Sequence, residues 1–165
     1  MIKRLQAWLS IGASILLTAP QLKADTSTED QSIRVLIVDG FSNHDWQATT
    51  KAIQSILSYD PEFDIDISTV PPLTSEEWQH WNPPFTNYDV VIQNTNDISK
   101  KGAWTEAAKQ AFESYIHNGG GMLAFHSANN AFREWEAYNQ MIGLGWRKKD
   151  FGFHSGRSSN SDSNR

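Results

Sequence analysis

Short apolar runs alternate with amphipathic segments along the middle of the chain. Residues 33–38 (IRVLIV) and 89–93 (DVVIQ) are runs of mostly β-branched residues that are too short for helices. This pattern is typical of parallel strands covered on both faces. Residues 63–70 alternate apolar with polar side chains, which predicts a strand with one wetter face, at a sheet edge. Residues 122–125 (MLAF) predict a fourth strand.

Helical patterns separate these predicted strands. The first predicted helix stops near Pro61 and has one apolar face, made by Ala52, Ile53, Ile56 and Leu57. A capping box at residues 74–77 predicts a short helix, and residues 104–117 show the clearest amphipathic pattern. Three glycines at 119–121 end that helix, because glycine adopts the left-handed conformation of a helix C-cap. Residues 135–142 predict the last helix.

Strands that alternate with helices imply right-handed crossovers and a parallel sheet. The sequence therefore predicts an α/β fold, a flavodoxin-like three-layer sandwich with a mostly parallel sheet in the strand order 2-1-3-4. In such sheets ligands bind outside the carboxyl ends of the strands, where the strand order reverses. Three loops rich in hydrogen-bonding side chains converge on that edge: residues 39–45, 94–97 and 126–130.

The N-terminus reads as a targeting segment. Lys3 and Arg4 precede a largely apolar stretch, residues 5–19, and Ala24 is the kind of small residue that signal peptidase requires. We therefore predict a signal peptide at residues 1–24, cleaved after Ala24, with an uncleaved membrane anchor as the alternative. Cleavage would leave a protein of the bacterial periplasm or the extracellular space, with no stable membrane association.

The rest of the domain organisation follows from the same patterns. Residues 25–32 are polar and unpatterned, which predicts a linker. Residues 33–152 form the predicted folded domain. Residues 153–165 are rich in serine and cannot bury apolar surface, so we predict a disordered tail there.

Composition narrows the functional classes. The 165 residues carry a net charge of -5 and show no clustered basic face, so we predict no nucleic-acid partner. Cysteine is absent, which excludes disulfides, thiolate metal sites and cysteine nucleophiles. Export without cysteine favours a periplasm over a disulfide-stapled extracellular domain.

Among the seven tryptophans, we predict that Trp46, Trp135 and Trp146 pack in the core.

His126 is the candidate catalytic residue, because it follows a buried strand at the carboxyl edge of the predicted sheet. Imidazole changes its protonation state near neutral pH, so it can serve as general base, nucleophile or metal ligand. The alternative is a histidine that only holds its own turn. His44, after the first strand, is the natural partner of His126, with helix capping or simple exposure as its alternative.

Asparagines in the converging loops, together with His44, are predicted to bind the hydroxyl groups of a substrate: Asn43, Asn94, Asn129 and Asn130. Asn129 and Asn130 fit a strained turn equally well, because asparagine tolerates one. A metal site would need Asp39 or Asp97 as a third ligand beside the histidines. No pair has a diagnostic spacing such as H-x-x-x-H, so we predict no metal or other cofactor, with a divalent metal as the alternative.

Three segments together resemble one protein family: residues 40–46 (GFSNHDW), 119–132 (GGGMLAFHSANNAF) and 135–146 (WEAYNQMIGLGW). They are similar to the ThuA-like family, which is named for trehalose utilisation and belongs to the class I glutamine amidotransferase-like superfamily. The resemblance covers residues 33–152 and implies a flavodoxin-like sandwich. In the amidotransferases the turn after the glycine-led strand carries a catalytic cysteine. The corresponding residue here is His126, so the thiolate route is excluded.

The resemblance also shapes the functional expectation. Family members usually continue with further strands and polar loops that complete the cleft, so we expect a fold that is incomplete at the C-terminus. We expect an exported protein that acts on or binds a carbohydrate or sugar derivative, with His126 as acid or base. The alternatives are a non-catalytic carbohydrate-binding module and a truncated product with little activity. The pattern indicates neither the reaction nor the oligomeric state.

Overall fold

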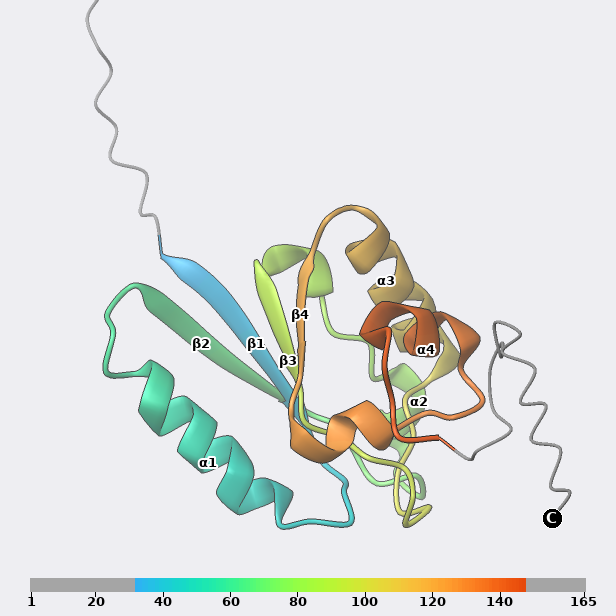
Figure 1. Ribbon diagram of the computed structural model, residues 1–165. Coiled ribbons are helices and arrows are strands. Elements are labelled where there is room, and N and C mark those ends of the chain that lie inside the picture. The colour runs from blue at the N-terminus through green and yellow to red at the C-terminus, as the bar shows by residue number, and fades with distance from the viewer. Residues whose placement is uncertain (1–31, 148–165) are drawn as a thin grey trace, which may run out of the picture. The chain divides into compact units, whose positions relative to one another are not determined.

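The computed structural model describes residues 32–147, which are built on a four-stranded parallel sheet. The strands lie in the order β2-β1-β3-β4, which confirms the predicted order and places β2 at an edge (Figure 1). β1 pairs with both β2 and β3, so it lies inside the sheet. The strands are β1 (Ile33–Asp39), β2 (Phe63–Thr69), β3 (Val90–Gln93) and β4 (Gly121–Ala124).

Several predicted segments lie outside the described residues. They are the signal peptide at 1–24, the linker up to residue 31 and the tail at 153–165. The predicted domain is described as far as residue 147. Within residues 32–147, no helix is long and apolar enough to cross a membrane.

Helices cover the two faces of the sheet unequally. α1 lies on one face, whereas α2, α3 and α4 lie on the other (Figure 1). This arrangement confirms the predicted three-layer α/β sandwich. The helices are α1 (Trp46–Leu57), α2 (Glu76–His80), α3 (Glu106–His117) and α4 (Glu136–Ile142), with the 3-10 helices η1 (Phe85–Asn87) and η2 (His126–Asn130).

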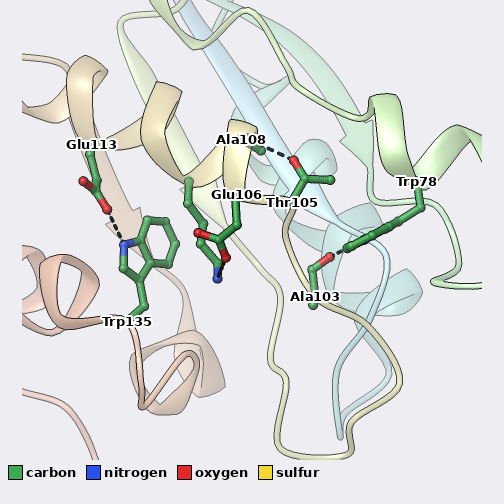
Figure 2. A network of polar contacts seen from close by, with 8 residues as sticks. Trp78, Ala103, Thr105, Glu106, Ala108, Glu113 and Trp135 are labelled. Atoms are coloured by element: carbon green, nitrogen blue, oxygen red, sulfur yellow. Dashed lines mark hydrogen bonds and ion pairs between the residues drawn. The ribbon is translucent and has the colours of Figure 1, made fainter.

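Side-chain caps set where the helices begin. The Thr105 hydroxyl accepts a hydrogen bond from the backbone N–H of Ala108 at 3.0 Å, so α3 begins after residue 105 and not at 104 as predicted (Figure 2). The cap of α2 is Ser75, one residue later than the predicted Thr74. Both predicted starts are early, because apolar spacing alone does not show which residue caps a helix.

The face under α3 and α4 holds a continuous aromatic core. Trp104 is 2% exposed, and its ring centroid lies 5.2 Å from that of Phe112 and 5.7 Å from that of Phe132. The indole N–H of Trp135 donates to the carboxylate of Glu113 at 2.5 Å (Figure 2). Aromatic rings in edge and tilted contacts therefore tie α3 to the segment that follows β4.

The predicted core tryptophans have three different outcomes. Trp135 is buried, which confirms its prediction. Trp46 is partly exposed at the start of α1. Trp146 is 73% exposed, so its core prediction is wrong. It follows the end of α4 at Gly143, and no element among residues 32–147 covers it or the neighbouring Leu144, which is 85% exposed.

The face under α1 has a smaller apolar core, made by Val35, Ile37, Ile53 and Ile92. Leu123 of β4 is the register partner of Ile92, so its side chain points to this same face. Leu123 is nevertheless 46% exposed. The single helix α1 therefore does not cover the β4 side of the sheet.

Candidate functional site

The structure brings the two candidate histidines together. His44 lies in the loop after β1, and His126 begins η2 after β4. Their ring centroids are 4.8 Å apart and their planes are tilted by 59°. Because β3 lies between β1 and β4 in the sheet, the two loops meet across the carboxyl end of β3. Both side chains are exposed, so both rings are accessible to a ligand.

The backbone of His126 is strained. Its φ angle is +47°, in the left-handed region that residues other than glycine rarely adopt. Phe132, at the end of the same turn, has φ +51°. A non-glycine residue in this conformation costs about 1–3 kcal/mol, so the surrounding structure has to hold the turn in place.

Polar side chains of the loop after β3 hold both ends of this turn. The side-chain amide of Asn96 donates to the backbone carbonyl of Ser127 at 2.6 Å. A carboxylate oxygen of Asp97 accepts from the backbone N–H of Phe132 at 2.8 Å. These two bonds supply partners for backbone groups that η2 leaves unpaired.

Two further side chains hold the middle of the turn. The buried phenol of Tyr138 donates to the carbonyl of Ala128 at 2.8 Å. Burial raises the pKa of this phenol, and Asp97 adds to the effect, whereas Arg147 opposes it. The guanidinium of Arg147 donates to the carbonyl of Ala131 at 2.9 Å. Burial lowers the pKa of Arg147, which stays charged at neutral pH because guanidinium titrates far above it.

Hydroxyl groups make a second contact between the two histidine-bearing loops. The hydroxyl oxygens of Ser42 and Ser127 are 3.4 Å apart, at the long end of hydrogen-bond distance. Ser42 also accepts from the backbone N–H of His44 at 3.2 Å. The two imidazoles and the two hydroxyls therefore form one polar cluster.

Two of the predicted residues point away from this cluster into the protein, and a third is bonded to the turn that carries His126. Asn94 is 7% exposed, and its amide donates to the hydroxyl of Thr50 at 3.1 Å. Asp39 is 2% exposed, and its two carboxylate oxygens accept from the hydroxyls of Thr50 and Thr69, each at 2.7 Å. Asp97 is bonded to the turn, as described above. Asn94 therefore has almost no surface to offer a substrate, and we leave it out of the proposed site.

The same contacts engage carboxylate oxygens of both candidate metal ligands, Asp39 and Asp97. Both carboxylate oxygens of Asp39 are occupied, and one oxygen of Asp97 is bonded to the backbone. Within residues 32–147, no group of three or more His, Cys, Asp and Glu side chains is placed to hold a metal ion. In the part of the chain that the structure describes, the histidine pair is not joined by the third protein ligand that catalytic zinc sites use.

The remaining predicted residues flank the histidine pair. Asn43 and Asn129 are exposed in the same two loops. Asn130 is half-buried, and its side-chain oxygen has no hydrogen-bond partner among the described residues. A hollow of about 450 Å³ lies elsewhere, between α3 and α4, where His117 and Met141 are part of its lining. This hollow is also lined by polar side chains, but only the exposed cluster at the sheet edge brings two imidazoles into contact.

Sequence reasoning missed Asn96, although residues 94–97 were expected to face the site. Asn94 and Asn96 have the same side chain two positions apart, and the pattern contains no signal that separates them. Asn94 bonds towards α1, whereas Asn96 bonds towards η2. The difference arises from where the chain turns after β3, which only the folded structure shows.

Comparison with known proteins identifies the family. A family model described as trehalose utilisation, ThuA, matches residues 34–163. The chain belongs to the ThuA family. Its structure is similar to that of a ThuA-like protein from Parabacteroides merdae ATCC 43184, with a TM-score of 0.64 and 29% sequence identity over 71% of this chain. No curated protein matches the chain.

A second solved structure, a ThuA-like protein from Bacteroides uniformis ATCC 8492, matches over 66% of this chain with a TM-score of 0.47 and 22% identity. The chain spans 40% of the Parabacteroides merdae protein and 42% of the Bacteroides uniformis protein. The segment matched by the ThuA family model includes both His44 and His126, so the histidine cluster belongs to the family domain.

Proposed function

We propose that this ThuA protein is exported and binds a carbohydrate or sugar derivative at the carboxyl edge of its sheet, where His126 acts as acid or base. The observation that carries the proposal is the contact between two exposed imidazoles, His44 and His126, with ring centroids 4.8 Å apart. The family description, trehalose utilisation, supports a sugar as the ligand. The charged and apolar pattern of residues 1–24 supports export.

The chemistry of the cluster suits hydroxyl groups. A neutral imidazole has one nitrogen that accepts a hydrogen bond and one that donates, so two adjacent rings can bind and exchange a hydroxyl proton near neutral pH. The exposed amides of Asn43 and Asn129 offer further donors and acceptors in the same loops. These groups would orient the sugar while His126 moves the proton.

One observation favours a second candidate, a carbohydrate-binding module without catalysis. Most glycoside hydrolases use a pair of carboxylates that face the scissile bond. Near this cluster, Asp39 is buried between two threonine hydroxyls, Asp97 is bonded to the backbone of Phe132, and Asp45 caps α1 by accepting from the backbone N–H of Ala48. A binding role would need only the imidazoles, amides and hydroxyls.

The test is a titration of the full chain with trehalose and a panel of related disaccharides and glycosides, by calorimetry, beside an assay for product formation. If the protein is an enzyme, His126→Ala should lower turnover by about 10²–10⁴-fold, the usual contribution of a general acid or base. Sugar affinity should then change little. If it is a binding module, the same variant should lose affinity, with no turnover in either protein.

His117→Ala is the matched control. His117 is also exposed, but it lies at the end of α3 and outside the cluster. This variant should keep the affinity and turnover of the unchanged protein. The proposal is wrong if no sugar in the panel binds, or if His117→Ala and His126→Ala have the same effect.

A further inference from the structure

Asn96 is a completely buried residue at the centre of the site, with three hydrogen bonds. Its backbone N–H donates to the carbonyl of Phe41, in the loop after β1, at 3.0 Å. Its side-chain amide nitrogen donates to the carbonyl of Ser127, in the turn after β4, at 2.6 Å. Its side-chain oxygen accepts from the backbone N–H of Ile98 at 2.9 Å. One 0% exposed residue thus joins all three converging loops.

The bond from Asn96 to Ser127 acts at the strained end of the turn. Ser127 directly follows His126, whose φ of +47° is the unfavourable backbone conformation. Tyr138 and Arg147 bond to carbonyls further along, at Ala128 and beyond. Asn96 therefore makes a side-chain bond to the residue directly after the catalytic candidate.

The backbone bond of Asn96 acts on the other histidine. Phe41 is 3% exposed and lies three residues before His44 in the same loop. Because one residue is bonded to both loops, a change in its side chain alters the separation of the loops. The separation of the loops in turn determines the separation of the two rings.

We propose that Asn96 is the positioning residue of the cluster: its amide holds the turn after β4 against the loop after β1 and so maintains the contact between the rings of His44 and His126. This inference rests on the proposed function, in which the contact presents both rings to one ligand. Its physical content, the ring separation, can be measured without any ligand.

Asparagine is the residue that these three partners require. Asn96→Asp keeps the shape of the side chain but replaces the donating amide with an oxygen, which faces the Ser127 carbonyl and repels it. Asn96→Ala removes both side-chain bonds, so the carbonyl of Ser127 and the backbone N–H of Ile98 lose these partners. Both variants break the link to the turn by different means.

Thr95→Val is the matched control. Thr95 is the neighbouring residue, it is also 0% exposed, and its hydroxyl accepts from the indole N–H of Trp104 at 3.2 Å. Valine has nearly the same shape as threonine, and this substitution removes one buried hydrogen bond. The lost bond is to Trp104 on the aromatic side of the loop, and it is not a bond to the backbone of either histidine-bearing loop.

The experiment compares the full chain with Asn96→Asp, Asn96→Ala and Thr95→Val. NMR records the nuclear Overhauser contacts between the rings of His44 and His126, and urea unfolding measures the stability of each protein. Both Asn96 variants should lose the ring contacts and shift the imidazole signals of both histidines. Their affinity for a bound sugar should fall about tenfold, as expected for a loosened site. Thr95→Val should lose stability yet keep the ring contacts.

A second measurement uses the unchanged protein, so it does not depend on any variant folding. The side-chain amide protons of Asn96 should exchange with solvent far more slowly than those of the exposed Asn43. Equal exchange rates, ring contacts that persist in the Asn96 variants, or an equal loss of contacts in Thr95→Val would overturn the inference. Absence of sugar binding with normal ring contacts would overturn the proposed function alone.

Discussion

The two faces of the sheet are packed very differently. The face under α3 and α4 buries interlocked aromatic rings, including Trp104, Phe112, Phe132, Trp135 and Tyr138. The face under α1 buries a few aliphatic side chains and leaves Leu123 46% exposed. Apolar burial contributes roughly 25 cal/mol per Å² removed from water, so the aromatic face supplies the larger part of the stability of residues 32–147.

The candidate site joins these unequal halves. The turn that carries His126 continues into Phe132, whose ring packs against Trp104 and Trp135. The loop that carries His44 leads into α1, the helix on the thinly packed face. The comparison shows that His126 is anchored directly by the aromatic core, whereas His44 lies between Phe41, which belongs to that core, and α1 on the thinly packed face, with Asn96 bonded to both loops.

Trp104→Ala is the substitution with the largest expected effect on the free energy of unfolding. The ring of Trp104 contacts five other aromatic rings, those of Trp81, Phe85, Phe112, Phe132 and Trp135. Trp104→Ala leaves a large cavity and should lower the free energy of unfolding by about 3–5 kcal/mol, measured by urea denaturation. Trp146→Ala, at a residue 73% exposed, is the control and should change it by less than about 0.5 kcal/mol. Similar losses in both variants would contradict the importance of the aromatic face.

A smaller effect is expected on the other face. Ile53 of α1 is 6% exposed and packs with the aliphatic cluster. Ile53→Ala should lower the free energy of unfolding by about 2 kcal/mol, the low end of the range for buried isoleucine, because this thin face can partly close the cavity. Ile56→Ala on the same helix, at a residue 67% exposed, is the matched control. A loss as large as that of Trp104→Ala would abolish the contrast between the faces.

The sequence predicts the fold well because apolar periodicity reports burial directly. The covered runs at 33–38 and 89–93 became β1 and β3, and the alternating run became the edge strand β2. Helix starts were displaced by one or two residues, since Thr105 and Ser75 cap the helices through specific hydrogen bonds. The run of four apolar residues in β4 does not indicate that one side of this strand is uncovered.

The site is less visible in the sequence. The meeting of His44 and His126 follows from topology, because both lie after parallel strands and the carboxyl ends of those strands share one edge. Which asparagine faces the turn depends on backbone geometry after β3, so Asn94 was favoured and Asn96 was missed. The sequence does not predict the left-handed φ of His126, since histidine, although enriched among non-glycine residues in that region, adopts other conformations far more often.

The smallest expected effect concerns Tyr138, which connects the aromatic face to the turn. Its phenol donates to the carbonyl of Ala128 at 2.8 Å. Tyr138→Phe keeps the ring and removes that bond, so the free energy of unfolding at pH 7 should fall by about 1 kcal/mol. Tyr59→Phe, at a residue 89% exposed, is the control and should leave it unchanged. No difference between the two variants would mean that the hydroxyl does not help to hold the turn.

Tyr138 should also make the free energy of unfolding depend on pH in alkaline solution. Burial raises the pKa of Tyr138 above the ordinary tyrosine value of about 10. Above about pH 10 the unfolded chain releases this proton while the folded chain keeps it, so the free energy of unfolding decreases as pH rises; below pH 10 the contribution is fully present. This can be measured by urea denaturation between pH 8 and pH 11, a range around the ordinary tyrosine pKa of about 10. The free energy of unfolding should decline less steeply with pH for Tyr138→Phe than for the unchanged protein. Burial also raises the pKa values of Tyr88 and Tyr115, so part of the decline should remain. Identical slopes would show that the phenol is hydrated, and the turn that carries His126 would then be anchored less deeply than its contacts indicate.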